Sequence, residues 1–308
     1  MDTPVLPHVP ALIAAHMRAA VDSRPGGRTG PFTIGLDPHT DEPMRNYAVP
    51  DGGARPGAGD IDALITFFRD RHRVPRLEYI EEDAPRVWPA LATAGFAVER
   101  RTPVMIALPA TRLAPRSPAG ITVRLATSDA DLAAAAAVQH DAYQMPYPPR
   151  PHDIARLTRL NQRGGLLAIA IDDASGTVAG SGLIDVAGDR PAAGELAAVA
   201  VLTAFRRQGI ASAVSAHLAR TAHSRGIGLV FLEAEPAEEQ IYRRTGFTDA
   251  TTKLWASIRL SVDRAGARFR SCGHRTWSRT MAATCATGTV VTTSSVADAR
   301  SSGSTVCW

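Results

Sequence analysis

Residues 195–247 constrain the fold of this 308-residue chain more than any other stretch. They open with a short apolar run, 195–202, which contains two β-branched valines and predicts a buried strand. From residue 210 to residue 223, apolar side chains recur at helical spacing. The turn Arg206-Arg207-Gln208-Gly209 separates the two, so the local order is strand, glycine turn and helix.

A helix that begins directly after such a turn is suited to bind an anion. Its first backbone N–H groups have no partner inside the helix, and the helix dipole places positive charge at the same end. Gly209 lets the backbone come close to a ligand, and Ala211 adds little bulk. Arg206 and Arg207 add charge for phosphate oxygens. We therefore predict a phosphate cradle built on the N–H groups of residues 208–213.

Two motifs in this stretch resemble the GNAT (Gcn5-related) N-acetyltransferase family. The first is Arg206-x-x-Gly209-x-Ala211 after a strand, which resembles the pyrophosphate-binding signature of that family. The second is Tyr242 followed shortly by Gly246-Phe247, which resembles a later family segment. The resemblance implies an N-acetyltransferase that takes acetyl-CoA as co-substrate, needs no metal, and acts on a small-molecule or peptide amine in a ternary complex.

The resemblance also implies a role for each residue of the site. The strand before the turn splays from its neighbour in this family, and its free amides bind the cofactor. The implied cofactor-binding set is Val199, Val201, Arg206, Arg207, Gln208, Gly209, Ile210, Ala211 and Ser212. Tyr242 is the expected general acid and Glu195 the expected general base, with Glu235 as a rival base. The alternatives are a tyrosine that only packs beside Gly-Phe and a glutamate that is merely solvated.

The acceptor pocket in this family is formed by the first two helices of the domain and the loop between them. Here that loop is 141–152, and its Asp141, Tyr143 and Tyr147 combine negative charge with aromatic rings. Such a combination suits a cationic amine through charge pairing and cation–π contact. None of the nine histidines forms a clustered metal motif.

The order of motifs in the first half of the chain repeats that of the second half. The strand–helix–strand spacing of residues 48–80 matches that of residues 200–233, and Gly95-Phe96 matches Gly246-Phe247. We infer an internal duplication of the α+β class, with two tandem GNAT-like units, each a mixed and mostly antiparallel sheet flanked by helices. The first unit is expected to be degenerate, because Asp60 at its helix start repels phosphate and Leu91 stands where Tyr242 is expected.

We predict four segments along the chain: a degenerate unit at 1–110, a proline-rich linker at 111–120, a catalytic unit at 121–261 and a disordered tail at 262–308. The tail holds six Arg, two Asp and all three cysteines, so the formal charge of +4 belongs to it and is poor evidence for a nucleic-acid partner. The single lysine, Lys253, is attributed to composition bias.

The elements predicted outside the key stretch are helices at 10–23, 60–71, 85–94, 129–140 and 153–162, strands at 31–36, 77–80, 121–125, 165–171, 178–186 and 254–260, and an extended segment from 95 through 108. Asp60 is expected to cap the second helix, and Asp129 or Asp131 the fourth. With no long apolar stretch and no signal-peptide pattern, a cytoplasmic monomer or homodimer that does not bind membranes is expected. The competing function is a sensor that binds acyl-CoA without turnover.

Overall fold

The computed structural model describes residues 9–113, 117–188 and 191–258. The tail predicted at 262–308 lies outside these residues, so its predicted disorder stays a prediction. The α-helices are α1 (Val9–Asp22), α2 (Ala58–Arg69), α3 (Val87–Thr93), α4 (Asp129–Ala142), α5 (Pro151–Gln162), α6 (Ile210–Ser224) and α7 (Glu239–Thr245). The strands are β1 (Gly26–Thr29), β2 (Phe32–Gly35), β3 (Tyr47–Pro50), β4 (Arg76–Ile80), β5 (Ala97–Ala107), β6 (Ile121–Leu125), β7 (Leu166–Asp172), β8 (Val178–Val186), β9 (Ala193–Val201), β10 (Leu229–Glu233) and β11 (Thr248–Ser257). Short 3-10 turns cover Pro43–Arg45 and Thr203–Phe205.

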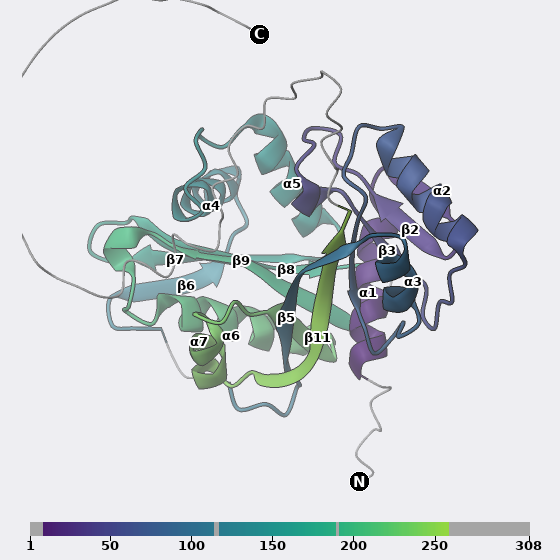
Figure 1. The fold of residues 1–308 in the computed structure, drawn as a ribbon. Coiled ribbons are helices and arrows are strands. Elements are labelled where there is room, and N and C mark those ends of the chain that lie inside the picture. The colour runs from purple at the N-terminus through teal and green to yellow at the C-terminus, as the bar shows by residue number, and fades with distance from the viewer. Residues whose placement is uncertain (1–8, 114–116, 189–190, 259–308) are drawn as a thin grey trace, which may run out of the picture. The chain divides into compact units, whose positions relative to one another are not determined.

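The described strands form one mixed sheet in the order β1-β2-β3-β4-β11-β5-β10-β9-β8-β7-β6 (Figure 1). Its neighbours are antiparallel except for two parallel pairs, β3 with β4 and β9 with β10. The α+β class and the mixed, mostly antiparallel sheet expected from the sequence are confirmed. No helix in the described ranges is both long and apolar enough to cross a bilayer.

The two halves of the chain exchange a strand at the centre of this sheet. β5 ends the first half in sequence, yet it lies between β10 and β11. β11 ends the second half, yet it lies between β4 and β5 (Figure 1). Each half therefore completes the sheet of the other. The boundaries at 110 and 121 stay a prediction, and a fragment that begins at residue 121 lacks the strand that covers one edge of β10.

The duplication inferred from the sequence appears as a repeated order of elements. The series β3, α2, β4, α3, β5 has the same form as β9, α6, β10, α7, β11, with one parallel strand pair in each. Even a hydrogen bond repeats: the Phe96 N–H donates to the Leu91 carbonyl, and the Phe247 N–H donates to the Tyr242 carbonyl, both at 3.0 Å. Leu91 therefore occupies the structural position of Tyr242, as the count from Gly-Phe predicts.

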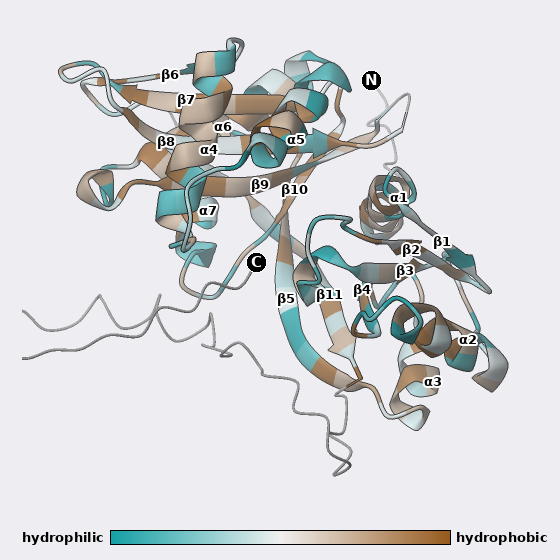
Figure 2. Ribbon diagram, turned by 90° about the horizontal axis from the view of Figure 1, so that it is seen from above, coloured by the Kyte–Doolittle hydropathy of each residue, from teal (hydrophilic) through white to brown (hydrophobic). Residues whose placement is uncertain are grey.

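Helices cover both faces of the strands from the second half (Figures 1 and 2). α4 and α5 pack on one face, around Leu157, Leu160 and Leu183, and α6 packs on the other. α6 approaches the sheet closely because β8 carries two glycines beneath it. A Cβ at Gly180 lies 2.8 Å from Ile210 Cγ2, and one at Gly182 lies 2.9 Å from Val214 Cγ1, so any larger residue displaces the helix.

Several element boundaries differ from the sequence prediction. Asp60 is not the N-cap of α2; Gly57 is, and the Asp60 carboxylate accepts a bond from the Gly57 N–H at 2.8 Å. Likewise Ser128, rather than Asp129 or Asp131, caps α4 and accepts from the Asp131 N–H. In both helices the aspartate stands three residues inside the cap, where a capping-box acid belongs. β1 was not predicted because its glycines suggested a turn, and β11 begins at Thr248 instead of near 254.

The exchanged strand β11 buries the chain's single lysine between two glutamates. Lys253 Nζ lies 2.8 Å from Glu78 Oε2 on β4 and also bonds Glu233 on β10. Trp255 Nε1 donates to Glu233 Oε2 at 3.2 Å, and Glu78 is paired with the buried Arg76. Composition bias therefore does not account for Lys253, since it neutralises carboxylates from both halves of the chain.

We predict that Lys253→Met destabilises the protein by about 3–5 kcal/mol, because it removes the cation bonded to Glu233 and leaves Glu78 with Arg76 alone in a buried site. Chemical denaturation followed by circular dichroism measures the change. The matched control is Arg243→Met, which breaks exposed ion pairs to Glu239 and Asp249 and should cost about 0–1 kcal/mol. Equal small losses for both variants would contradict a structural role for Lys253.

Candidate active site

The turn between β9 and α6 has the strained backbone that a close approach to a ligand requires. Gly209, the N-cap of α6, has φ of 83°, and Arg207 also lies in the left-handed region, with φ of 63°. A left-handed arginine is unfavourable and points to a constraint beyond local preference. Arg206 Nε donates to the Val201 carbonyl at 3.3 Å, which ties the turn to the end of β9.

The first turn of α6 leaves a row of backbone donors free. No side chain caps the helix, and within the described residues no hydrogen bond joins the N–H groups of Ile210, Ala211 and Ser212 to a partner. The first internal bond runs from the Ala213 N–H to the Gly209 carbonyl at 3.0 Å. The cradle predicted over 208–213 is therefore one residue shorter, because Ala213 is already bonded.

β9 diverges from β10 just before this turn. Parallel pairing joins the two strands only from Ala193/Leu229 to Glu195/Phe231. Further along β9, Ala198 has φ of 51° and the register with β8 skips a residue, which marks a bulge. Past the bulge β9 still pairs with β8 but has no described strand on its other edge.

The bulge determines which amides of β9 face the open edge. The Leu202 N–H donates to the Ala179 carbonyl of β8 at 2.9 Å. Because successive N–H groups of a strand point to opposite edges, those of Val201 and Val199 point away from β8 and toward the gap left by β10. These are the two amides that the sequence singled out. They lead directly into the donors of the α6 turn, so one line of N–H groups runs along the splay.

Tyr242 lies on α7, in the apolar cluster against which Val199 and Val201 pack, and is 8% exposed. Its ring packs edge-on against Phe247, with centroids 6.1 Å apart. Burial, with the Glu238 charge adding to it, raises the pKa of Tyr242 well above its usual range. Burial also raises the pKa of the neighbouring Tyr143 to about 12. Tyr242 therefore keeps its proton at neutral pH and can donate it.

Glu195 stands where the parallel pairing of β9 ends. Burial raises its pKa to about 7; the Lys253 charge opposes this rise, and the charge of Glu233 adds to it. Glu195 also lies directly opposite Asp185 in the β8–β9 ladder, and like charges so placed favour the neutral form of one of them. A carboxyl poised near neutrality can accept a proton at physiological pH.

The rival base has a different environment. Glu235 follows β10, is half exposed and bonds Arg100, whose guanidinium carbon lies 3.6 Å from the centroid of the Trp255 ring. The Glu235 carboxylate therefore lies in solvent and is already paired with a guanidinium. Its neighbour Glu238, which sequence reasoning missed, is more enclosed, and burial raises its pKa.

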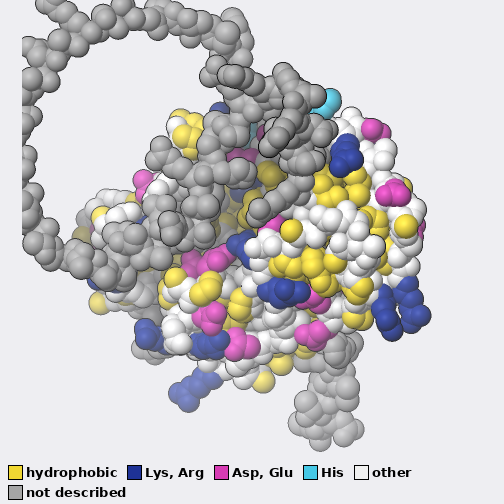
Figure 3. Space-filling model, viewed as in Figure 1, with side chains coloured by type: hydrophobic (Ala, Val, Ile, Leu, Met, Phe, Trp, Pro, Cys, Tyr) yellow, Lys and Arg dark blue, Asp and Glu magenta, His cyan; other side chains and the backbone are white. Residues whose placement is uncertain are grey.

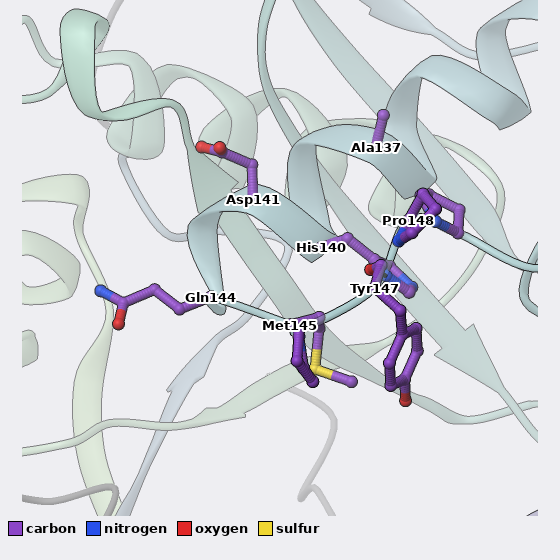
Figure 4. A pocket seen from close by; sticks show the side chains of 9 residues that line it. Ala137, His140, Asp141, Gln144, Met145, Tyr147 and Pro148 are labelled. Atoms are coloured by element: carbon purple, nitrogen blue, oxygen red, sulfur yellow. Dashed lines mark hydrogen bonds between the residues drawn. The ribbon is translucent and has the colours of Figure 1, made fainter. Parts of the chain in front are cut away.

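The three predicted acceptor residues are divided between two places. Asp141 and Tyr147 line an open depression of about 600 Å³ at the end of α4, where Figure 4 shows the Tyr147 ring and the Gln144 side chain on opposite sides of Met145. The Arg150 guanidinium already stacks on the Tyr147 ring, 4.0 Å from its centroid, so this ring is not free for a ligand cation. Tyr143 belongs instead to the cluster with Glu238 and Tyr242.

Neither a metal cluster among the described residues nor one dominant charge on the face in Figure 3 is present. Among the residues that the structure describes, no group of three His, Cys, Asp or Glu side chains could hold a metal ion. On the face in Figure 3, basic and acidic side chains are interspersed over the described residues.

A comparison with protein families identifies the segment that holds this geometry. Residues 132–247, which include the splay, the turn and Tyr242, match the model of the acetyltransferase (GNAT) family. This segment is a GNAT domain. A search of curated protein sequences returned no significant match.

The similarity of this chain to solved structures extends beyond the GNAT domain. A GCN5-related N-acetyltransferase from Kribbella flavida is 23% identical, with a TM-score of 0.66 over 85% of this chain and 97% of that one. A GCN5-related N-acetyltransferase from Sphaerobacter thermophilus is 19% identical, with a TM-score of 0.57 over 74% of this chain and 76% of that one. A tandem GNAT protein from the clavulanic acid biosynthesis pathway is 13% identical, with a TM-score of 0.52 over 80% of this chain and 93% of that one. At these identities the likeness concerns the fold, and it supports the tandem architecture.

We predict that Glu195 titrates near pH 7. In a carbon-13 NMR titration of glutamate-labelled protein, one carboxyl resonance with a midpoint near 7 should disappear in Glu195→Gln. Glu235→Gln serves as the control and should leave that resonance in place. A Glu195 resonance with an ordinary midpoint near 4.3 would contradict the enclosed environment described here.

Proposed function

We propose that the chain transfers the acetyl group of acetyl-CoA to an amine by direct attack in a ternary complex. The observation that carries the proposal is the edge of β9 that has no described strand beside it past Glu195, which is the edge of the Val199 and Val201 amides, and which leads to the free N–H groups of Ile210, Ala211 and Ser212 on α6. An extended ligand with a pyrophosphate at one end fits such a line. When bound, acetyl-CoA supplies an acetyl group activated as a thioester.

The cradle residues hold the cofactor in this proposal. The α6 N–H groups and the helix dipole bind the pyrophosphate, and Arg206, Arg207 and Gln208, all exposed at the turn, add polar contacts to its oxygens. Gly209 lets the backbone approach, since the nearest heavy atom to a Cβ placed there is Pro118 Cγ at 3.6 Å. The amides of Val199 and Val201 bind the pantetheine arm and polarise the thioester carbonyl.

Glu195 and Tyr242 are proposed to move the protons. Glu195 accepts a proton from the amine, directly or through water, and it acts only when ionised, so the rate should rise as the pH increases through about 7. Tyr242 donates its proton to the departing sulfur. Glu235 stays the alternative base, although its ion pair with Arg100 makes it less available.

The first half of the chain is proposed to support the site rather than to form a second one. Asp60 places a carboxylate in the first turn of α2, where the equivalent turn of α6 has free donors. Leu91 replaces Tyr242 and has no proton to give. A cytoplasmic location and a monomeric or homodimeric state stay predictions from the sequence, as does the absence of nucleic-acid and membrane partners.

Gly209→Asp is expected to weaken acetyl-CoA binding, measured by calorimetry, by at least about 1.5–3 kcal/mol, because it adds negative charge beside the pyrophosphate and removes a charge-assisted contact. Gly226→Asp is the matched control. Gly226 follows the opposite end of α6, also has a left-handed φ, and has no heavy atom within 4 Å of its Cβ position. Equal effects of the two variants would show that backbone strain, not charge at the cradle, weakens binding.

Tyr242→Phe separates an enzyme from a sensor. The variant keeps the ring but loses the only proton, so acetyl-CoA should bind as before while coenzyme A release falls by roughly 10²–10⁴-fold. Tyr79→Phe is the control, since it removes a buried hydroxyl that has no hydrogen-bond partner in the structure. Wild-type turnover by Tyr242→Phe would make the tyrosine structural. Tight acetyl-CoA binding without turnover on any amine would favour the sensor.

A further inference from the structure

Arg156 on α5 is a charged side chain that neither the fold nor the proposed reaction uses. Its Nε is buried and has no hydrogen-bond partner, and no ion pair joins it to a carboxylate within the described residues. The charged groups that face it are Arg45, Asp153, Asp185 and Arg163. Two of these four groups are cations and two are carboxylates, so together they do not neutralise the positive charge of Arg156.

The carboxylates around Arg156 already have partners. Asp185 bonds Arg163. Asp153 accepts the Arg150 N–H at 2.9 Å and lies 3.4 Å from His140 Nε2 and 3.5 Å from His152 Nε2.

The nearby cation is also paired, because Arg45 Nη1 lies 3.3 Å from Asp37 Oδ2. Among the described charges of this region, Arg156 is therefore the one without an ion-pair partner.

An enclosed arginine without a partner is energetically unfavourable. Burial lowers the pKa of Arg156, and the charge of Arg45 adds to this effect, which shows that its surroundings disfavour the cation. A lysine could respond by losing its proton, but a guanidinium stays charged at any physiological pH. An external anion can compensate it, because the residue is only partly buried and the terminal nitrogens of a guanidinium can donate to a carboxylate or a phosphate.

The position of Arg156 relates it to the proposed base. α5 packs on the sheet face that carries Leu183 and Ala197. Alternation along β8 and β9 places Asp185 and Glu195 on that same face, and the two residues lie directly opposite each other. The charge of Asp185 acts on both Arg156 and Glu195, so Asp185 lies near both.

We propose that Arg156 binds an anionic group of the acceptor, so that the substrate class is an amine that also carries a carboxylate or a phosphate. This rests on the proposed function, in which the amine end lies at Glu195. The acceptor then has a cationic end near Glu195 and Asp185 and an anionic end at Arg156. An amino acid or a phosphorylated amino alcohol has this distribution of charge.

The test compares amines that differ only in the anionic group. The probes are a panel of L-amino acids with their carboxamides, and O-phosphoethanolamine with ethanolamine. Binding to the full chain is measured by calorimetry in the presence of coenzyme A, for wild type, Arg156→Met and Arg159→Met. Arg159 is the matched control because it lies on the same helix and is exposed.

The anionic member of at least one pair should bind wild type ten-fold or more tightly than its neutral counterpart. Arg156→Met should abolish that difference, and Arg159→Met should keep it. Preference within the carboxamide pairs indicates a carboxylate ligand, and preference within the ethanolamine pair a phosphate. No preference in wild type, no binding by any anionic amine, or an unchanged preference in Arg156→Met would overturn the proposal. If acetyl-CoA itself binds normally, the proposed function survives such a result.

A second measurement needs no ligand. If Arg156 is an uncompensated cation in the free protein, Arg156→Met should raise the melting temperature, because it removes a desolvated charge and keeps the apolar stem. Arg159→Met should leave it unchanged. A lower melting temperature for Arg156→Met would show that the guanidinium has a structural partner, which overturns the anion site.

Discussion

The rest of the structure depends on the exchange of β5 and β11 at the centre of the sheet, which the buried Lys253 holds in place. Lys253 arrives on β11 from the second half of the chain and bonds Glu78 from the first half and Glu233 from the second. Arg76 also pairs with Glu78, so removing Lys253 would leave Glu78 with one cation and take away the cation bonded to Glu233. This interaction makes the two halves one sheet and gives β10 a partner on the edge away from β9.

That partner explains how β9 and β10 can separate without loss of the fold. β10 remains fixed by β5 along Val230–Glu233, so its pairing with β9 can end at Glu195. β9 is held by β8 past the bulge at Ala198. Both strands are thus anchored on their outer edges, and the edges between them keep free amides. The first half of the chain contributes to the site by supplying this anchor.

Local signals in the sequence predicted the secondary structure around the turn well. The turn at 206–209, the helix from Ile210 and the strand Leu229–Glu233 follow from glycine chemistry and apolar periodicity. Strand exchange could not be predicted, because β5 and β11 have the same local pattern whichever half they complete. The roles of Lys253 and Arg156 could not be predicted for a related reason. Whether a buried cation has an ion-pair partner depends on which carboxylates the tertiary structure brings close to it. The presence of a single lysine in an arginine-rich chain was unusual, but composition alone could not identify the carboxylates that pair with it.

Amide hydrogen exchange with and without acetyl-CoA tests the central claim most directly, which is that the splayed edge and the α6 turn of the second half hold the cofactor. We expect slower exchange at Val199, Val201 and Ile210–Ser212 when acetyl-CoA is present, because free N–H groups gain acceptors. We expect no such change at the equivalent turn of the first half, residues 51–60. Protection that appears at residues 51–60, with the amides of β9 and α6 unaffected, would contradict it.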